Sequence, residues 1–504
     1  MDRRQFLHGT AAAGALAVGI RPISALAQSD PFVRLDATAQ ANLVRKGEVS
    51  SLELVDAAIA RIEKLNPALN AVVHTRFDKA RDLAASGAVP DGPFKGVPYL
   101  IKDLSPLEGE PHTLGSKLFA GNIADHDAGG VQRAKEAGLV ILGKTNTPEF
   151  GLLATTESEL LGPARNPWNL DYHTGGSSGG AAGAVASGMV PFAHASDGGG
   201  SIRIPASVCG LVGLKPSRSR MFTGDDEPLP GDIGVRLAVS RSVRDTAQIF
   251  NVSERKGADA VYEPVGYVEG PGNRRLKIAF STENYVGAQA HPHVKAAIER
   301  TAKLCADLGH DVVERKPFLN GEEFIDQFIG IWASSPSELV ANAWLIGLTQ
   351  FRWTSAEEGL EPWTRGLADW FDKKEAANPG VIERALAYFK QVEAQYDTYF
   401  DEVDVELTPV LRSPPMKLGE QAPDVPFDTL FERVLDYVSY TPQHNVAGTP
   451  ALSLPLSMSP DGLPIGSQFA TKKGGERTLL ELAYELEMAA PWGDRWAPNS
   501  AVNL

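Results

Sequence analysis

The chain has 504 residues and a formal net charge of −15, with 43% hydrophobic and 22% charged residues. This apolar content is too high for a disordered chain, and two cysteines exclude a scaffold built on disulfides. The acidic balance argues against a nucleic-acid backbone as the main partner. At roughly 150 residues per domain the length allows about three domains, although one large α/β unit could hold the same chain. A small-molecule enzyme or a binding protein remains.

The first 27 residues have the pattern of an export signal. Two arginines stand in the string DRRQFL (2–7), a small apolar run follows at 11–20, and the segment ends in ALA (25–27). This order is typical of a twin-arginine secretory signal. The apolar run is too short and too rich in Ala and Gly for a membrane span. We therefore expect a mature chain of 28–504 that is periplasmic or secreted and has no membrane span.

Helical and strand patterns then alternate along the chain. Residues 52–65 place apolar side chains at helical spacing with charged residues between them. Short β-branched runs such as 97–101 follow, and a clear unit consists of a strand at 276–281, a helix at 292–308 and a strand at 311–314. Strands that alternate with helices predict a mostly parallel sheet covered on both faces.

Aromatic residues concentrate in the segment 318–400. This segment has a helical pattern and holds 15 of the 39 aromatic residues, among them five of the eight tryptophans. We expect a helical insertion that packs over one end of the sheet. Most of its rings would form a small core of their own, and some would face a substrate.

A phosphate-loop pattern at 138–145 lacks the context that the motif needs. The string GLVILGKT satisfies G-x-x-x-x-G-K-[ST]. Phosphate binding requires a flexible loop whose N–H groups wrap the phosphates, whereas the four middle residues here are themselves a predicted strand. We therefore expect no nucleotide site.

A second pattern, G-x-S-x-G, centres on Ser178. It matches the nucleophile elbow of α/β-hydrolases, which must leave an apolar strand and enter a helix. Residues 169–174 make a poor strand, although 181–187 make a plausible helix. With His444 as the base, this elbow is an alternative hydrolase site.

Glycine and serine are concentrated between residues 173 and 216. Glycine fills 11 of these 44 positions, mainly around the strings GGSSGG (175–180) and DGGGS (197–201). Backbone N–H groups in such runs can point into a pocket without obstruction by side chains. The run Gly198-Gly199-Gly200-Ser201 could therefore direct consecutive donors at one oxygen, as an oxyanion hole requires. Composition alone also fits a surface loop.

These strings resemble the signature of the amidase signature family, a GGSSGG loop followed by D-x-G-G-S-I-R-x-P. Further matching strings are GKTNTPEF (143–150), RNPWNL (165–170), GLKPSRSR (213–220), NVAGTPALSLP (445–455) and DGLPIGSQ (461–468). The resemblance covers nearly all of 28–504. It implies one α/β/α sandwich in which helices cover a large twisted mixed β-sheet, with a catalytic core at about 92–250 and a substrate-facing helical insertion at about 318–400.

The resemblance also implies a catalytic set of a lysine, a serine in a cis peptide and a nucleophilic serine. On this chain they are Lys102, Ser177 and Ser201. Burial would lower the pKa of the lysine from ~10.4, so that neutral Lys102 could accept a proton through Ser177 while Ser201 attacks an amide carbonyl. The N–H groups of 198–201 would hold the oxyanion, and water would hydrolyse the acyl-enzyme through the same relay.

Three further residues are expected to support this site. Ser178 would contribute hydrogen bonds, whereas Asp197 and Arg203 would shape the loop rather than touch substrate.

Gly198 departs from the family, in which Thr, Ile or Ala is more usual at that position. We therefore expect a more flexible oxyanion loop.

Within the family, the scaffold strings most resemble the branch that contains 6-aminohexanoate cyclic dimer hydrolase. The insertion departs from that branch, because Trp332 stands where the hydrolase has a pocket cysteine. We expect Trp332 and Phe150 to line the substrate pocket. Cyclic or linear 6-aminohexanoate oligomers and apolar or aryl amides are the expected substrates. The alternatives within the family are a peptide amidase, an aryl acylamidase and a carbamate hydrolase.

Other classes fit the sequence less well. The export signal argues against the glutamine amidase subunit of the transamidosome, whose tRNA partner is cytoplasmic. A periplasmic binding protein would have no use for Lys102, Ser177 and Ser201. The relay supplies base, nucleophile and oxyanion site, so we expect no metal and no cofactor. We expect a monomer or a homodimer. Its partner would be a small-molecule amide substrate and not a nucleic acid.

Overall fold

An eight-stranded sheet occupies the centre of the computed structural model, which describes residues 30–224, 230–258, 260–350 and 354–504. Its strand order is β12-β11-β13-β15-β14-β9-β10-β8. The strands are β8 (Phe192–Asp197), β9 (Val212–Lys215), β10 (Val235–Ser240), β11 (Lys277–Phe280), β12 (Asp311–Glu314), β13 (Val405–Pro409), β14 (Ala451–Met458) and β15 (Pro464–Ala470). The predicted signal at 1–27 lies outside the described residues.

A three-stranded sheet continues the layer. Its order is β1-β3-β2, formed by β1 (Val72–Thr75), β3 (Val140–Thr145) and β2 (Pro98–Lys102). Strand β2 lies beside β8 at the edge of the larger sheet. The ends of β2 and β8 are therefore close together, although about 90 residues of chain separate them.

The sheet is mixed, as the family resemblance implies. Strand β11 pairs in parallel with β12 and β13, and β2 pairs in parallel with β3, whereas the remaining ladders of the two sheets are antiparallel. The expectation of a mostly parallel sheet is therefore wrong. The short turn 459–463 joins β14 to β15, and such a turn can connect only antiparallel neighbours. The parallel β11-α9-β12 unit matches the predicted strand, helix and strand.

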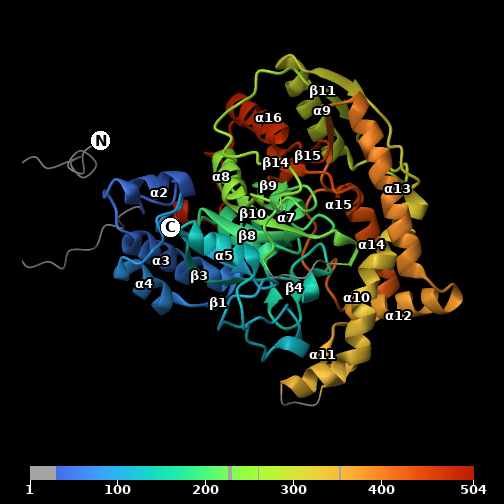
Figure 1. Ribbon diagram of the computed structural model, residues 1–504, viewed down its shortest axis with the longest axis horizontal. Coiled ribbons are helices and arrows are strands. Elements are labelled where there is room, and N and C mark those ends of the chain that lie inside the picture. Colours follow the sequence, from blue (N-terminus) through green and yellow to red (C-terminus); the bar gives the residue numbers. More distant parts are fainter. Residues whose placement is uncertain (1–29, 225–229, 259, 351–353) are drawn as a thin grey trace, which may run out of the picture.

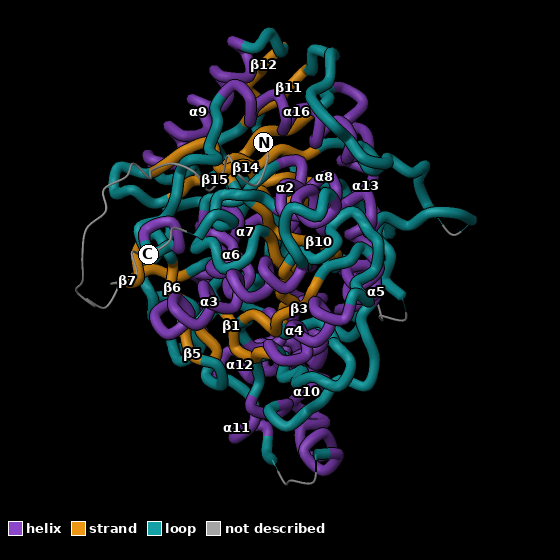
Figure 2. The backbone as a smooth tube through the Cα atoms, turned by 90° about the vertical axis from the view of Figure 1, so that its left-hand side faces the viewer, coloured by secondary structure: helices purple, strands orange, loops and turns teal. Residues whose placement is uncertain are grey.

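Helices cover both faces of the sheet (Figure 1; Figure 2). They are α2 (Ala37–Arg45), α3 (Ser51–Leu69), α4 (Phe77–Ser86), α5 (Gly129–Glu136), α6 (Gly179–Ala186), α7 (Arg203–Cys209), α8 (Val243–Ser253), α9 (Pro292–Asp307) and α16 (Glu476–Ala489). The Ser50 side chain caps α3 in a capping box with Glu53, which explains where the predicted amphipathic helix begins. None of the helices in the described part of the chain combines the length and the apolar content that crossing a membrane needs.

A second group of helices lies together on one side of the molecule, coloured yellow to orange in Figure 1. It comprises α10 (Gly321–Thr349), α11 (Ala356–Gly359), α12 (Pro362–Ala377) and α13 (Val381–Glu402), with α14 (Phe427–Tyr437) and α15 (Pro442–Val446) against them. Phe324, Trp363 and Tyr396 belong to a separate buried core within this group. Most of the rings therefore pack on one another.

The phosphate-loop pattern and the G-x-S-x-G pattern have clear structural contexts. Residues 140–145 form strand β3, so most of the phosphate-loop string is itself a strand and not a loop that follows one. Residues 169–173 do form a strand, β7, which the sequence did not predict. It pairs with β6 (Arg165–Asn166) in a two-stranded ribbon outside the two larger sheets, and Tyr172 forms an isolated bridge with Lys417.

Candidate active site

Lys102 ends strand β2 and is fully buried. Its Nζ donates hydrogen bonds to Ser177 Oγ at 2.7 Å and to Ser196 Oγ at 3.0 Å. Ser177 follows a cis peptide bond from Gly176 and precedes α6, and Ser196 lies in β8. Helix α6 lies against both β2 and β8, so the predicted lysine and the first predicted serine come into direct contact. Ser196 is a third member of this cluster that the sequence did not indicate.

Burial controls the charge of this lysine. It lowers the pKa of Lys102 well below the usual 10.5, because no water solvates the ammonium. Asp197 opposes the shift, and the positive charge of Arg236 adds to it. A neutral lysine can accept a proton, so the geometry and the charge state suit a base that acts through Ser177.

The carboxylate next to Lys102 in the chain has another partner. Asp103 Oδ1 lies 2.9 Å from the Nζ of Lys144 on β3. That ammonium also donates to the carbonyl oxygens of Ser105 and Pro111 at 2.8 and 3.1 Å. Lys144, the lysine of the phosphate-loop string, is therefore part of the buried scaffold, and Asp103 is not the counter-ion of Lys102.

Ser201 lies in the turn between β8 and α7 and is 7% exposed. The Asp197 side chain stabilises the loop that carries Ser201, because Gly200 N–H donates to Asp197 Oδ1 at 2.7 Å. This contact corrects one predicted donor of the oxyanion hole: the Gly200 N–H points to a carboxylate. No hydrogen bond among the described residues takes up the N–H of Gly198, Gly199 or Ser201. These three groups are the donors that the loop can offer to an oxyanion.

A buried ion pair shapes the same loop. Arg203 Nε and Nη2 donate to the two carboxylate oxygens of Asp197 at 3.0 and 2.9 Å. Although burial favours the neutral acid, the guanidinium holds the pKa of Asp197 well below its usual range. Asp197 also accepts from Ile202 N–H, so the carboxylate connects both ends of the loop. Asp197 thus contacts the loop backbone directly, and Arg203 holds the Asp197 carboxylate in place.

Helix α15 and its N-cap residue, Thr441, supply two contacts that the sequence patterns did not indicate. Thr441 Oγ1 donates to the carbonyl oxygen of Gly199 at 2.7 Å, and the Thr441 carbonyl accepts from Arg203 Nη1. Asn445 Nδ2 donates to Asp197 Oδ1 at 2.9 Å. Asn445 is the first residue of NVAGTPALSLP, one of the strings that match the family, and this match could have indicated it. The peptide between residues 199 and 200 is therefore held at both its carbonyl and its N–H.

Ser178 and His444 take part in separate contacts. Ser178 Oγ donates to the Ser196 carbonyl at 3.2 Å, which fits a supporting role. The Nδ1 of His444 faces Thr449 Oγ1 at 3.0 Å, and its Nε2 lies 3.3 Å from a carboxylate oxygen of Glu406. Burial lowers the pKa of His444 and raises that of Glu406 to about 8. No hydrogen bond joins Ser178 to His444 within the described chain, so the predicted elbow pair is not assembled.

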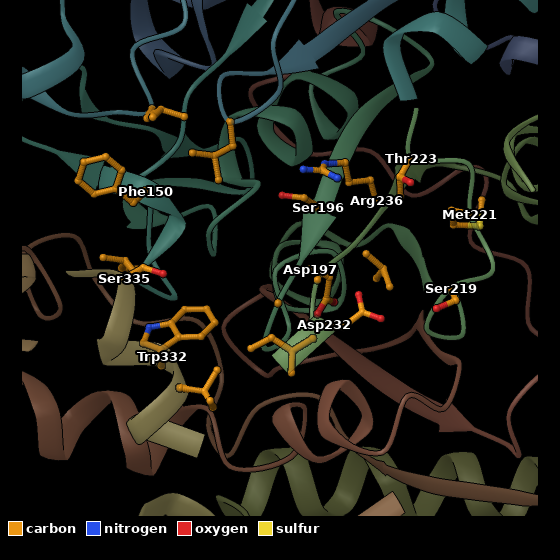
Figure 3. A pocket seen from close by; sticks show the side chains of 18 of the residues that line it. Phe150, Ser196, Asp197, Ser219, Met221, Thr223, Asp232, Arg236, Trp332 and Ser335 are labelled. Atoms are coloured by element: carbon orange, nitrogen blue, oxygen red, sulfur yellow. The ribbon is translucent and has the colours of Figure 1, made fainter. Parts of the chain in front are cut away.

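A cavity of about 620 Å³ lies beside the oxyanion loop and is lined by Ser196, Asp197 and Gly198. Figure 3 shows its two sides, with Phe150 and Trp332 facing Ser219 and Thr223 across the cavity. Phe150 and Trp332, which the sequence predicts as pocket residues, thus both line this cavity. From α10 the lining residues are Ile331, Trp332, Ser335, Pro336 and Leu339. Their spacing is that of one helical face, so α10 forms a wall of the cavity.

A smaller apolar pocket of about 60 Å³ lies on the other side of the loop. It is lined by Gly199 and Ser201 and by side chains of the helical insertion, among them Phe328 and Trp363. Trp332 lines both spaces and stacks on Phe328 with ring centroids 5.5 Å apart. The oxyanion loop and the Trp332 ring therefore separate the large cavity from the apolar pocket.

Metal ligands are not grouped in the described residues: no set of three or more His, Cys, Asp or Glu side chains could hold an ion there.

Comparison with known proteins agrees with this geometry. The family model Amidase matches residues 53–480. AmiC of Mycobacterium tuberculosis (strain ATCC 25618 / H37Rv) is 40% identical over 475 residues, which cover 94% of this chain and 98% of AmiC. The 6-aminohexanoate-cyclic-dimer hydrolase of Pseudomonas sp. (strain NK87) is 39% identical, over 91% of this chain and 95% of the hydrolase. A structure of 6-aminohexanoate cyclic dimer hydrolase with substrate superposes with a TM-score of 0.84 at 34% identity, covering 93% of this chain and 99% of that chain.

The chain therefore belongs to the Amidase family and is a hydrolase that acts on amide C–N bonds. The resemblance to the branch that contains 6-aminohexanoate cyclic dimer hydrolase is confirmed by both sequence and structure.

Proposed function

We propose that this enzyme hydrolyses a carboxylic amide through an acyl-enzyme on Ser201, with Lys102 as the base and Ser177 as the proton relay. The observation that supports it most is the 2.7 Å contact between Lys102 Nζ and Ser177 Oγ, made by a fully buried lysine. A lysine in that state accepts a proton readily, and a hydroxyl with such a neighbour can pass one on.

The reaction proceeds in two halves. In the first, Ser201 Oγ loses its proton through Ser177 to Lys102 and bonds to the amide carbon. The carbonyl oxygen becomes an oxyanion opposite the N–H donors of the loop, the C–N bond breaks, and the proton passes through Ser177 to the leaving amine. In the second half, water gives up its proton to the same relay and attacks the ester, which releases the carboxylic acid and restores Ser201.

The two spaces beside the loop suit an amide with an apolar acyl group. The apolar pocket that contains Ser201 is lined by aromatic and aliphatic side chains, such as Tyr285, Phe324 and Leu435. Cyclic or linear 6-aminohexanoate oligomers and apolar or aryl amides are therefore the proposed substrates. A peptide amidase, an aryl acylamidase and a carbamate hydrolase are the alternatives that the substrate panel below distinguishes.

Export is part of the proposal. The string DRRQFL, the apolar run 11–20 and the ALA end at 25–27 support a twin-arginine route to the periplasm or beyond. Replacing the arginine pair of the string by two lysines should leave the protein in the cytoplasmic fraction. If the unaltered chain itself stays in that fraction, this part of the proposal is wrong.

A fluorophosphonate probe tests the nucleophile. We expect the probe to label Ser201 and to leave Ser201→Ala unlabelled, while Ser178→Ala still reacts. Turnover of a panel of aliphatic amides, peptide C-terminal amides, anilides, carbamates and 6-aminohexanoate dimers then identifies the substrate class. Labelling at Ser178 in place of Ser201 would favour the elbow with His444, and ligand binding without labelling or turnover would favour a binding protein.

A further inference from the structure

The amino group of Lys102 has two hydrogen-bond partners among the residues that the structure describes, and both are hydroxyls. Ser177 Oγ lies 2.7 Å from Nζ, and Ser196 Oγ lies 3.0 Å from it. The proposed proton relay uses only Ser177. Ser196 lies on β8 and lines the large cavity, where Figure 3 shows its side chain. Ser196 therefore contacts the base without belonging to the relay.

The second hydroxyl matters because a neutral amine accepts a proton only through its single lone pair. When Lys102 takes up the proton of Ser177, that lone pair must point at the Ser177 hydroxyl, and the two N–H groups of Nζ must face elsewhere. Within the described chain, Ser196 Oγ is the other acceptor that Nζ reaches. A hydrogen bond from Nζ to Ser196 thus restricts the rotation of the amine and directs its lone pair to Ser177.

This contact suits both protonation states of Lys102. The ammonium donates to both hydroxyls, as the two distances allow. In the neutral amine the contact with Ser177 reverses, because the Ser177 hydroxyl now donates to Nζ, whereas Nζ still donates to Ser196. Only the Ser177 contact changes direction when the proton moves, and the Ser196 contact keeps its direction throughout.

Ser178 holds the backbone of Ser196 in place. Its Oγ donates to the Ser196 carbonyl at 3.2 Å and accepts from the Ser196 N–H at 3.3 Å. Because Ser178 follows Ser177 in the chain, these bonds close a ring that runs from Lys102 through Ser177, Ser178 and Ser196 back to Lys102. The two hydroxyls that Nζ bridges are therefore fixed relative to each other.

The charged and titratable groups around Lys102 do not replace this acceptor. Arg236 on β10 and Lys144 on β3 are cations and accept no hydrogen bond. His194 on β8 is uncharged at neutral pH, because burial lowers its pKa to about 3. Asp197 opposes the fall in the pKa of Lys102 through its charge, while its two oxygens accept hydrogen bonds from the oxyanion loop and its arginine.

We propose, resting on the proposed function, that Ser196 is a positioning residue that orients the amino group of Lys102 for proton exchange with Ser177. Its hydroxyl accepts a hydrogen bond from Nζ in both protonation states. The reacting proton itself moves only between Ser201, Ser177 and Lys102, and Ser196 acts through the lysine.

Two variants of equal size isolate the hydroxyl. Ser196→Thr keeps it, whereas Ser196→Val replaces it by a methyl group, and both β-branched side chains suit a strand. On a neutral amide, Ser196→Thr should keep most of kcat on the alkaline plateau. Ser196→Val should lose about tenfold in kcat with little change in KM. Equal losses of kcat in the two variants would assign the effect to packing and overturn the inference.

The pH profile gives a readout that packing would not move. A hydrogen bond to an ammonium is stronger than one to a neutral amine, so Ser196→Val should lower the pKa of Lys102 further. The acidic limb of kcat/KM should therefore lie about one pH unit lower in Ser196→Val than in Ser196→Thr. An acidic limb at the same pH in both variants would overturn the inference.

Ser187→Ala is the control for the loss of a buried hydroxyl. The Ser187 hydroxyl donates to the Ala184 carbonyl at 3.1 Å, and Ser187 lines neither the large cavity nor the apolar pocket. This variant should keep the acidic limb of the unaltered enzyme. A limb that moves equally in Ser187→Ala and Ser196→Val would show a general effect of losing a hydroxyl and would overturn the inference.

A direct titration separates this inference from the proposed function. NMR of enzyme with isotope-labelled lysine Cε, assigned with Lys102→Met, follows the protonation of Lys102 without turnover. We expect a lower pKa in Ser196→Val than in Ser196→Thr. Equal pKa values would overturn the role of Ser196, while labelling of Ser201 and an inactive Lys102→Met still upheld the mechanism. Turnover by Lys102→Met would overturn the mechanism, and the orienting role with it, whatever the titration shows.

Discussion

Asp103 forms its ion pair with Lys144, 2.9 Å away on the neighbouring strand, and not with Lys102, which precedes it in the chain. Both lysines are fully buried. Lys144 faces a carboxylate and two carbonyl oxygens, whereas Lys102 faces the hydroxyls of Ser177 and Ser196. Lys144 therefore has partners that stabilise its positive charge, whereas Lys102 has partners suited to proton exchange.

This difference predicts that two matched substitutions affect different properties, one the stability and the other the turnover. Lys144→Met leaves the buried Asp103 carboxylate without its cation, so the free energy of unfolding should fall by about 3–5 kcal/mol. Lys102→Met should abolish turnover and change the free energy of unfolding far less. Urea denaturation and amide hydrolysis measure the two effects. Equal stability of Lys144→Met and the unaltered enzyme would contradict the assignment of Lys144 to the scaffold.

The pH profile of kcat/KM should report the neutral form of Lys102. Because its pKa lies well below 10.5, activity should persist far below that pH, fall as the pH drops through the pKa of Lys102, and reach a plateau on the alkaline side. A neutral amide is the appropriate substrate. Arg236→Gln removes a cation that lowers this pKa, so the acidic limb should move to higher pH. An acidic limb that moves to lower pH in Arg236→Gln would contradict the assignment of this limb to Lys102.

Thr441 should position the oxyanion loop through the Gly199 carbonyl, which accepts from its hydroxyl at 2.7 Å. Thr441→Val removes this hydrogen bond at nearly constant volume, and we expect kcat to fall about tenfold with little change in KM. Thr441→Ser keeps the hydroxyl and should restore most of kcat. If Ser and Val variants lose kcat equally, packing and not the hydrogen bond explains the effect.

Gly200 should tolerate no side chain. Its φ is +139°, and a Cβ would lie 2.4 Å from Thr441 Oγ1 and 2.6 Å from Ile204 Cδ1. Gly200→Ala must displace the loop, and we expect a loss of kcat of at least the 10²–10³ (about 3–4 kcal/mol) typical of losing an oxyanion donor. Gly270→Ala is the control, because its Cβ meets nothing within 4 Å. Normal kcat in Gly200→Ala would show that the loop conformation is not needed.

Trp332 should set the size of the acyl group, since it lines both the cavity and the apolar pocket. Trp332→Ala joins the two spaces, so kcat/KM should rise for bulky aryl acyl groups and fall for acetyl amides, each by about tenfold. Leu345→Ala is the control on the same helix, because Leu345 is 48% exposed. An equal loss of kcat/KM for all acyl groups would indicate disturbed packing of α10 instead.

The sequence by itself determined the family, the mixed sheet that the family implies, and the residues of the predicted triad. Ordered strings such as GGSSGG and DGGGS carry that information because they specify local backbone conformation and chemistry together. Periodicity also predicted the β11-α9-β12 unit correctly, since its contacts are local. The alternation of patterns did not reveal that most ladders are antiparallel, because strand direction depends on which strands become neighbours.

Only the tertiary structure decided the partners of the buried polar groups. Asp103 could have paired with either lysine, and strand order selected Lys144. Gly200 N–H looked like an oxyanion donor, but the folded loop turns it toward Asp197. Thr441 reaches the same loop from 242 residues away, a contact that no local pattern encodes. Hydrogen bonds between such distant residues form only after the sheet brings their strands and helices together. The sequence therefore indicates the candidate groups, and the fold determines which of them contact one another.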